Sequence, residues 1–118
     1  MTTTDSIVIL LPGQGAQHSG MGRAWAEASE AARQVFDAAD AMLGWELSKV
    51  CFEGEDEQAN RTDVAQAAIY VTSVACFKGL VERGRIEPAG LAAAAGLSLG
   101  EYTALHLAGA FDFETGLR

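Results

Sequence analysis

The chain has 118 residues, of which 49% are apolar, so it forms one folded domain at most and is too apolar to be disordered. Its net charge of −8, from 16 acidic and 8 basic residues, argues against a nucleic-acid partner and an anionic membrane surface, because both are bound by basic clusters. Cys51 and Cys76 make no disulfide framework, and their apolar surroundings predict buried, reduced thiols.

The pattern of the first residues indicates no targeting segment. Residues 1–6 contain no Lys or Arg, and the apolar run Ile7–Leu11 is too short for the core of a signal peptide. No run approaches the ~20 apolar residues of a membrane-spanning helix. We therefore expect no membrane partner, and a cytoplasmic location follows by default.

The first predicted element is a strand over Ile7–Leu11, which is short, β-branched and continuously apolar. Such a run is typical of a strand buried on both faces of a parallel sheet. Pro12 and Gly13 end the strand, and a glycine-rich loop follows. One amphipathic helix is then predicted from Ala26 to Leu43, with Gly44 directly after its end.

Two more helices are predicted before the second strand. A short one fits Trp45–Phe52, and a long one fits Val64–Arg83 behind an N-cap at Thr62 or Asp63. The charged segment between these two helices is expected to be exposed. The long helix is apolar nearly all round as far as Phe77, so we expect it to be buried.

A second strand is predicted over Leu91–Ala95, and a helix follows it over Leu99–Ala108. Leu105 and Leu107 indicate that this helix is buried, and Asp112 can cap a further helix. The order of strands and helices predicts an α/β fold with a doubly wound parallel sheet. Two strands would leave much of such a sheet unpaired, so residues 1–118 are expected to be the first part of a larger domain.

The stretch Gly96-Leu97-Ser98-Leu99-Gly100, between the second strand and its helix, matches the G-x-S-x-G nucleophile elbow. A sharp strand-to-helix turn lifts Ser98 clear of the backbone, and the N-terminus of the helix faces developing negative charge. Gly96 and Gly100 are expected where strand and helix crowd together. The elbow favours a helix-rich, α/β-hydrolase-like parallel sheet. Because the pattern is short, the alternative is a glycine-flanked turn with an ordinary serine.

Taken with Pro12-Gly13-Gln14-Gly15-Ala16-Gln17 after the first strand, the elbow resembles the malonyl-CoA:acyl carrier protein transacylases of fatty-acid synthesis and the related acyltransferase domains of polyketide synthases. Two further matches are Thr62…Gln66-Ala67-Ala68 and Ala108–Phe113. The resemblance spans Ile7 to Arg118. It implies that residues 1–118 are the N-terminal portion of an acyltransferase domain and that the portion is incomplete.

The resemblance implies a ping-pong transfer in which Ser98 attacks malonyl-CoA and the resulting malonyl-serine passes its malonyl group to the pantetheine thiol of acyl carrier protein. The backbone N–H groups of Gln14 and Leu99 would form the oxyanion hole. Gln66 maps near the active site of the family, and its alternative is a polar residue paired within a buried helix. No cofactor is implied, and no His, Cys and Asp cluster has metal-ligand spacing.

Three residues depart from the pattern of the family. Leu97 stands where a histidine is usual, Ala67 replaces a proline, and Ala16 replaces a common serine. The histidine before the serine is not the general base, so we expect the change at Leu97 to be tolerated.

The resemblance also implies a general base and a carboxylate clamp that these 118 residues lack. The arginine of the clamp aligns just beyond the last residue, and Arg118 is in the wrong register. The catalytic histidine lies far downstream. His106 is no substitute, because eight residues of helix separate it from Ser98 by about 12 Å along the axis. His18 is interpreted as a solvated loop histidine.

Several functions stay open beside a freestanding malonyl transacylase. One is a polyketide synthase-type acyltransferase. Another is a truncated, non-catalytic fragment that only binds acyl carrier protein, for which Lys78, Arg83 and Arg85 are the only basic cluster. A third is an unrelated serine hydrolase, against which the Pro12–Gln17 loop argues. The freestanding malonyl transacylase is the preferred interpretation, because Met1 stands only six residues before the first predicted strand.

Overall fold

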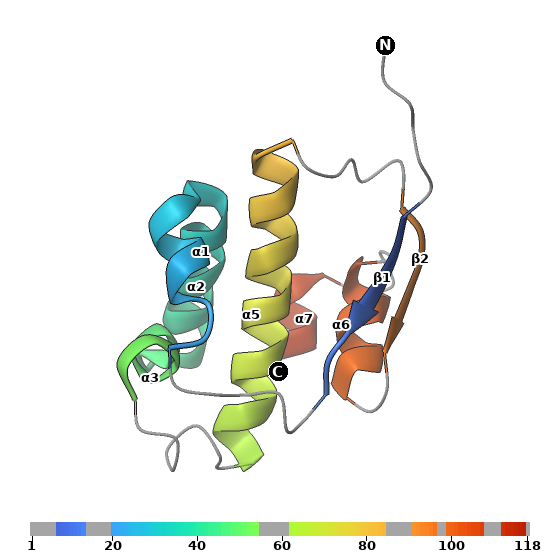
Figure 1. Cartoon of the computed structure of the whole chain (residues 1–118). Coiled ribbons are helices and arrows are strands. Elements are labelled where there is room, and N and C mark those ends of the chain that lie inside the picture. The colour runs from blue at the N-terminus through green and yellow to red at the C-terminus, as the bar shows by residue number, and fades with distance from the viewer. Residues whose placement is uncertain are drawn as a thin grey trace.

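The computed structural model describes residues 7–13, 20–54, 62–84, 91–96, 99–107 and 112–117. These form a mixed α/β segment that is mostly helical and has two parallel strands. Figure 1 shows α1, α2 and α3 on one side of α5, and α6 and the two strands on the other. The elements run in the order β1 (Ile7–Leu11), α1 (Arg23–Ala28), α2 (Glu30–Leu43), α3 (Leu47–Glu53), α5 (Thr62–Glu82), β2 (Leu91–Gly96), α6 (Leu99–Leu107) and α7 (Phe113–Leu117).

The core lies mainly between α2 and α5, which pack along one another. Phe36 is 1% exposed and meets the ring of Phe52 edge-on, with 4.8 Å between ring centroids. Trp25 of α1 lies directly over Gly79 of α5, where a Cβ would come within 2.6 Å of the indole. Tight packing of this kind is where large side chains contribute most to stability. Other fully buried side chains are Leu47, Ile69, Val71 and Val74.

The single helix predicted over Ala26–Leu43 is two helices, because the chain breaks at Ser29. This residue has extended backbone angles (φ −136°, ψ 123°), and its hydroxyl accepts a hydrogen bond from the N–H of Ala32 at 3.2 Å. In the first turn of α2 the Ala32 N–H has no acceptor within the helix, and the Ser29 hydroxyl provides one. The amphipathic pattern runs through the break, so it conceals the cap.

The start of α2 is also held by α5. The Glu82 carboxylate accepts hydrogen bonds from the Ser29 hydroxyl at 2.7 Å and from the Ala31 N–H at 2.6 Å. The bonds from Ser29 and Ala31 hold the pKa of Glu82 below its ordinary value of 4.5. One side chain at the end of α5 therefore completes the cap of a helix more than fifty residues earlier.

The predicted helix ends are mostly confirmed. Gly44 follows α2 in the left-handed region (φ 78°), and its N–H bonds the Asp40 carbonyl at 3.0 Å. The short helix is confirmed as α3. Helix α5 begins at Thr62 itself, so Thr62 and Asp63 lie in its first turn rather than before it.

Helix α5 also qualifies the expectation that no segment is long and apolar enough to span a membrane. Residues Val64–Glu82 have a mean hydropathy of 1.5 over a membrane-spanning length. Half of this stretch is buried inside the protein, where Ala65, Val71 and Ala75 are fully enclosed. The buried half of α5 belongs to the hydrophobic core that it shares with α2.

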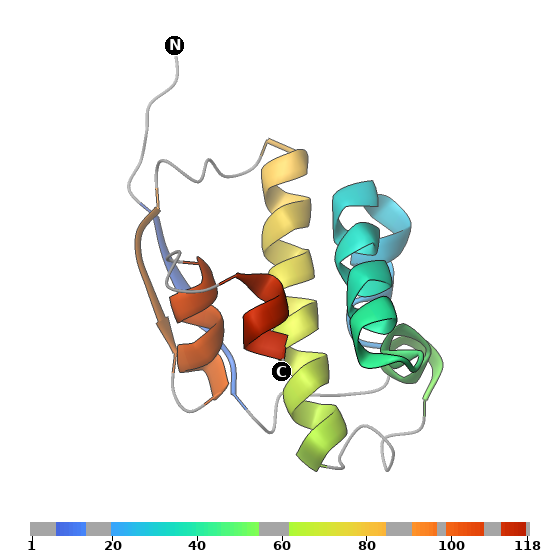
Figure 2. The same cartoon turned by 180° about the vertical axis from the view of Figure 1, so that it is seen from behind.

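The predicted strands form a parallel pair in which Val8 to Leu11 lie opposite Ala93 to Gly96, with an irregularity after Ile7. The expectation that β1 is buried on both faces is wrong. Leu11 is buried, but Val8 is 59% and Leu10 is 79% exposed. Figure 2, the view from behind, shows α6 lying against the strands. Among the described residues, β1 has β2 as its one strand partner.

Helices α6 and α7 close the side of α5 that faces the strands. Helix α6 is confirmed, but Leu105 is 42% exposed and Leu107 is half-buried, whereas Thr103 and Ala104 are buried. Small residues face inward because α6 lies close to both strands and to α5. The predicted helix after Asp112 is confirmed as α7, and the Tyr70 hydroxyl of α5 donates to the Phe113 carbonyl at 3.1 Å.

Candidate functional site

Four chain segments meet at one end of the molecule. Both strands end there, and α5 and α6 begin there, as the arrowheads and the first helical turns in Figures 1 and 2 show. Functional sites of parallel α/β sheets lie outside the carboxyl ends of the strands. The fold therefore places the two predicted motifs, which follow β1 and β2, at the same end.

The end of β2 and the first turn of α6 lie as close together as a nucleophile elbow requires. A Cβ on Gly96, the last residue of β2, would lie 2.7 Å from the Gly100 Cα and would overlap the Gly100 carbonyl group. Real Cβ atoms do not approach backbone that closely, so glycine is required at residue 96. The predicted crowding of strand and helix is confirmed.

Gly100 brings the second motif to the same place. A Cβ on Gly100 would overlap the Leu11 carbonyl oxygen and would lie 3.1 Å from the Pro12 carbonyl oxygen. The first turn of α6 therefore lies directly against the end of β1, where the Gln14 loop begins. The close approach of the two backbones holds the first turn of α6 against the end of β1, and a side chain at residue 100 would separate them.

The predicted site residues fall unevenly on the described chain. Ser98 and Gln14 lie outside the described residues, although their flanking segments at Gly13, Gly96 and Leu99 are described. Gln66 lies in the first turns of α5 with its side chain exposed, at the end of the molecule where the strands stop. An exposed amide is free to face a substrate, and the role of Gln66 stays a prediction.

Leu99 is the first residue of α6, and its half-buried side chain packs against the core. The first N–H groups of a helix have no acceptor within the helix, and the helix dipole adds partial positive charge there. The Leu99 N–H is therefore available to an anionic oxygen beside the turn. Its position suits the predicted oxyanion role, which the described contacts leave untested.

His106 lies in an aromatic cluster that joins α5, α6 and α7. Its ring is 5.9 Å from the Tyr70 ring and 6.0 Å from the Phe113 ring, and Tyr70 and Phe113 stack at 5.4 Å. Burial, with a smaller contribution from Asp112, raises the pKa of Tyr70 to about 12, so its hydroxyl stays protonated and donates. This cluster attaches α7 to the core. His18 lies outside the described residues.

The two cysteines are free thiols in different surroundings. Cys51 is buried as predicted, and burial raises its pKa to about 12. Cys76 is only half-buried, which corrects the expectation for that residue, and burial raises its pKa as well. Neither thiol has the lowered pKa of a catalytic cysteine. Within the described ranges, no group of three or more His, Cys, Asp and Glu side chains could hold a metal ion.

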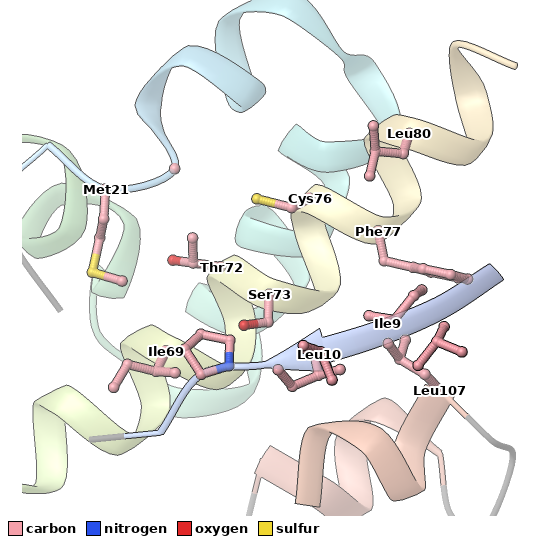
Figure 3. Close-up of a pocket in the computed structure, with 14 residues that line it drawn as sticks. Ile9, Leu10, Met21, Ile69, Thr72, Ser73, Cys76, Phe77, Leu80 and Leu107 are labelled. Atoms are coloured by element: carbon pink, nitrogen blue, oxygen red, sulfur yellow. The ribbon is translucent and has the colours of Figure 1, made fainter. Parts of the chain in front are cut away.

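One feature beside β1 was not anticipated from the sequence. A cavity of about 590 Å³ lies between β1 and α5, with Met21 and Leu107 at its rim. Figure 3 shows Thr72, Ser73 and Cys76 of α5 above Ile9 and Leu10 of β1. Because α5 is apolar all round, its pattern does not distinguish a face covered by neighbours from a face that is open.

Comparison with known proteins gives a consistent result. Residues 8–118 match the acyl transferase domain family. The chain is 43% identical over 112 residues to the polyketide biosynthesis protein PksE of Bacillus subtilis, covering 95% of this chain and 14% of that protein. It is 44% identical over 108 residues to the malonyl CoA-acyl carrier protein transacylase of Bacillus subtilis, covering 92% of this chain and 33% of that protein.

The fold agrees with solved structures of the same group. The acyl-carrier-protein S-malonyltransferase from Burkholderia pseudomallei superposes with a TM-score of 0.87 at 33% identity, and the match covers 95% of this chain and 35% of that one. The chain thus spans about the N-terminal third of its transacylase relatives.

Proposed function

Because this chain belongs to the acyl transferase domain family, we propose that it carries the nucleophile of an enzyme that transfers a malonyl group from malonyl-CoA to the pantetheine thiol of acyl carrier protein. The observation that carries the proposal is the backbone contact of Gly96 with Gly100 and of Gly100 with the end of β1. This contact supports a turn that presents Ser98 beside the loop that bears Gln14.

The reaction has two steps at one serine. The Ser98 hydroxyl oxygen attacks the malonyl thioester carbonyl while a general base takes its proton, and the tetrahedral oxyanion is stabilised by backbone N–H groups of Gln14 and Leu99. The carbon–sulfur bond breaks, and coenzyme A leaves as the thiol after it takes a proton. The pantetheine thiol then attacks the malonyl-serine ester, and Ser98 leaves with the proton restored.

The base and the group that binds the malonyl carboxylate belong to the part of the domain that this chain does not cover. Loss of general-base assistance typically slows a reaction by ~10²–10⁴-fold. We therefore expect residues 1–118 alone to transfer malonyl groups at a negligible rate. Rapid malonylation of Ser98 in the isolated chain would contradict this assignment of roles.

The test is a chimera in which residues 8–118 replace the matching N-terminal third of the Bacillus subtilis transacylase, which is 44% identical there. Intact mass after exposure to malonyl-CoA should rise by one malonyl group, and the Ser98→Ala chimera should show no increase. Addition of acyl carrier protein should discharge the label to its pantetheine thiol. A folded chimera that remains unlabelled, or that passes malonyl only to water, would reject the transferase proposal.

The similarity to PksE supports a polyketide synthase-type acyltransferase as the second candidate. The same chimera separates the two, because its labelled form can be offered an acyl carrier protein of fatty-acid synthesis and one of polyketide synthesis in parallel. A preference of at least tenfold for one carrier would assign the pathway. Binding of either carrier without malonyl transfer would instead favour the non-catalytic fragment.

A further inference from the structure

The segment that carries Gln14, residues 14–19, has described residues on both sides of it. It leaves the described chain after Gly13 and rejoins it at Gly20. The near end follows the backbone contact between Gly100 and the end of β1. At the far end, the anchor Gly20–Gly22 leads into α1 and contacts α2, α3 and α5.

The anchor is hydrogen-bonded to α3. The Gly20 N–H donates to the Cys51 carbonyl at 2.7 Å, and Gly20 has a φ of 87°, in the left-handed region that favours glycine. Cys51 lies in the last turn of α3, where carbonyl groups have no partner within the helix. One contact therefore caps α3 and attaches the far end of the Gln14 segment.

The next two residues of the anchor pack into the core. Met21 is 6% exposed and belongs to the buried cluster that includes residues of α2, α3 and α5. Gly22 has a φ of 79°, and a Cβ on it would lie 2.6 Å from the Phe36 ring and 3.3 Å from the Thr72 methyl carbon. Because Gly20 and Gly22 have no side chains, Met21 supplies all the side-chain burial of the anchor.

Helix α3 is a fixed support for the anchor. The Asp40 carboxylate of α2 accepts hydrogen bonds from the Ser48 N–H at 2.9 Å and from the Ser48 hydroxyl at 2.5 Å. In the last turn of α3, Phe52 meets the Phe36 ring edge-on. The helix that receives the Gly20 bond is therefore attached to α2 near both of its ends.

We propose that Met21 is a positioning residue for the oxyanion hole, because it holds the far end of the Gln14 segment in the core. The proposal rests on the proposed function, in which the Gln14 N–H stabilises the oxyanion. Such donors act only where they are aligned with the developing charge, and a misplacement of about 1 Å can slow a reaction about 100-fold. The competing explanation is that Met21 only stabilises the fold.

The first experiment measures the anchor without catalysis. Hydrogen exchange is followed in the chimera of residues 8–118 with the Bacillus subtilis transacylase, for wild type and for Met21→Ala. The Gly20 amide should exchange at least tenfold faster in the variant, because the packing that holds its bond to Cys51 is lost.

The Gly44 amide is the matched control in the same molecule. Gly44 also has a positive φ, of 78°, and its N–H donates to the Asp40 carbonyl at 3.0 Å. Its exchange should change less than twofold. Unchanged exchange at Gly20 would overturn the proposal, and so would an equal acceleration at Gly20 and Gly44, which would show a general loss of stability.

The second experiment measures the reaction. Malonylation of Ser98 in the chimera is followed at increasing concentrations of malonyl-CoA. Because an oxyanion donor acts in the transition state, Met21→Ala should lower the maximal rate at least tenfold and change the half-saturating concentration less than twofold. Met21→Leu keeps most of the buried volume and should retain at least half of the wild-type rate.

Val74→Ala is the matched control for a loss of stability. Val74 is 1% exposed in the same core, and it lies two residues after Thr72, so it faces the opposite side of α5 from the anchor. At a temperature where the variants are folded, it should slow malonylation less than twofold. Equal slowing by Val74→Ala and Met21→Ala would overturn the proposal.

A further variant and the wild-type chimera separate the remaining outcomes. Met21→Val removes fewer atoms, so it replaces Met21→Ala if that variant does not fold, and it should show the same split between maximal rate and half-saturation to a smaller extent. A wild-type maximal rate in the folded Met21 variants would overturn the positioning role and leave the proposed function intact. A wild-type chimera without label would reject the proposed function, and the positioning role with it, while the exchange at Gly20 would still report the anchor.

Discussion

The two sides of α5 differ in how completely they are packed. On the side of α2, Phe36 and Leu47 are enclosed to within 1% of full burial, and an edge-on aromatic pair and a shared helix cap connect the elements. On the side of β1, Leu10 is 79% exposed above an open cavity. The proposed chemistry lies on the open side. The enclosed side therefore contributes most of the buried core, and the open side carries the candidate site.

The largest expected effect is a difference in the free energy of unfolding between substitutions on the two sides of α5. Phe36→Ala should lower the free energy of unfolding by about 3–5 kcal/mol, because it empties a filled position in the enclosed core. Leu10→Ala should change it by less than about 0.5 kcal/mol, because the side chain is exposed. Urea unfolding of residues 1–118 followed by circular dichroism measures both. Similar costs for the two variants would show that the sides are equally packed.

The next effect concerns the contact between the elbow and the end of β1. Gly100→Ala places a methyl group against the Leu11 and Pro12 carbonyl groups and should destabilise the chain by about 1–3 kcal/mol. In the chimera it should also slow malonylation about 100-fold, since a displacement of about 1 Å at a reacting centre can cost that much.

Leu105→Ala is the control for that variant, because Leu105 is 42% exposed on the same helix. It should change neither unfolding nor malonylation appreciably. A Gly100→Ala chimera with the wild-type rate would mean that the separation of loop and elbow does not govern the site.

A smaller effect is expected at the junction of α1 and α2. Ser29→Ala removes both the cap of α2 and a donor to Glu82, and should cost ~1 kcal/mol. Ser29→Thr keeps a hydroxyl and should retain most of the stability. Thermal unfolding of the three proteins measures the difference. An unchanged Ser29→Ala protein would show that the helix break does not depend on this cap.

The smallest effect is a pH dependence carried by Glu82. Hydrogen bonds from Ser29 and Ala31 lower the pKa of Glu82 in the folded state, so its charged form stabilises the fold above the ordinary pKa of 4.5. That stability is lost as the pH falls through the lowered value. Glu82→Gln should therefore be less stable than wild type at pH 7, and the two should converge as the pH falls below 4.5. A stability difference that does not change with pH would exclude the carboxylate as its source.

Most elements of the fold could be predicted because their signals are local. Apolar runs mark the strands at Ile7–Leu11 and Leu91–Ala95, and glycine marks the end of α2. The break at Ser29 was missed because the amphipathic pattern runs through it, and because Glu82, which completes the cap, lies fifty-three residues later. The exposure of β1 was also missed, since an apolar run indicates what a strand requires in its complete sheet and not how many neighbours are present.

The site could be predicted in part. Glycine spacing located the elbow, and the described contacts of Gly96 and Gly100 confirm the crowding expected there. The contact of Gly100 with Leu11 could not be predicted, because it depends on how two strands lie side by side. The cavity was missed because α5 is apolar all round, so its sequence has no periodic signal that separates the enclosed face of the helix from the open face.

The pairing of β1 with β2 has a consequence for how the chain folds. Ile7 lies opposite Leu91, which comes 84 residues later in the chain (91 − 7). Strand β1 is therefore synthesised long before its partner, whereas α2 and α5 can pack before β2 exists. Contacts between distant residues form late because closing long loops costs entropy. In refolding followed by pulsed hydrogen exchange, amides of α2 and α5 should gain protection before those of β1. Until β2 pairs with it, β1 is exposed to association with other chains.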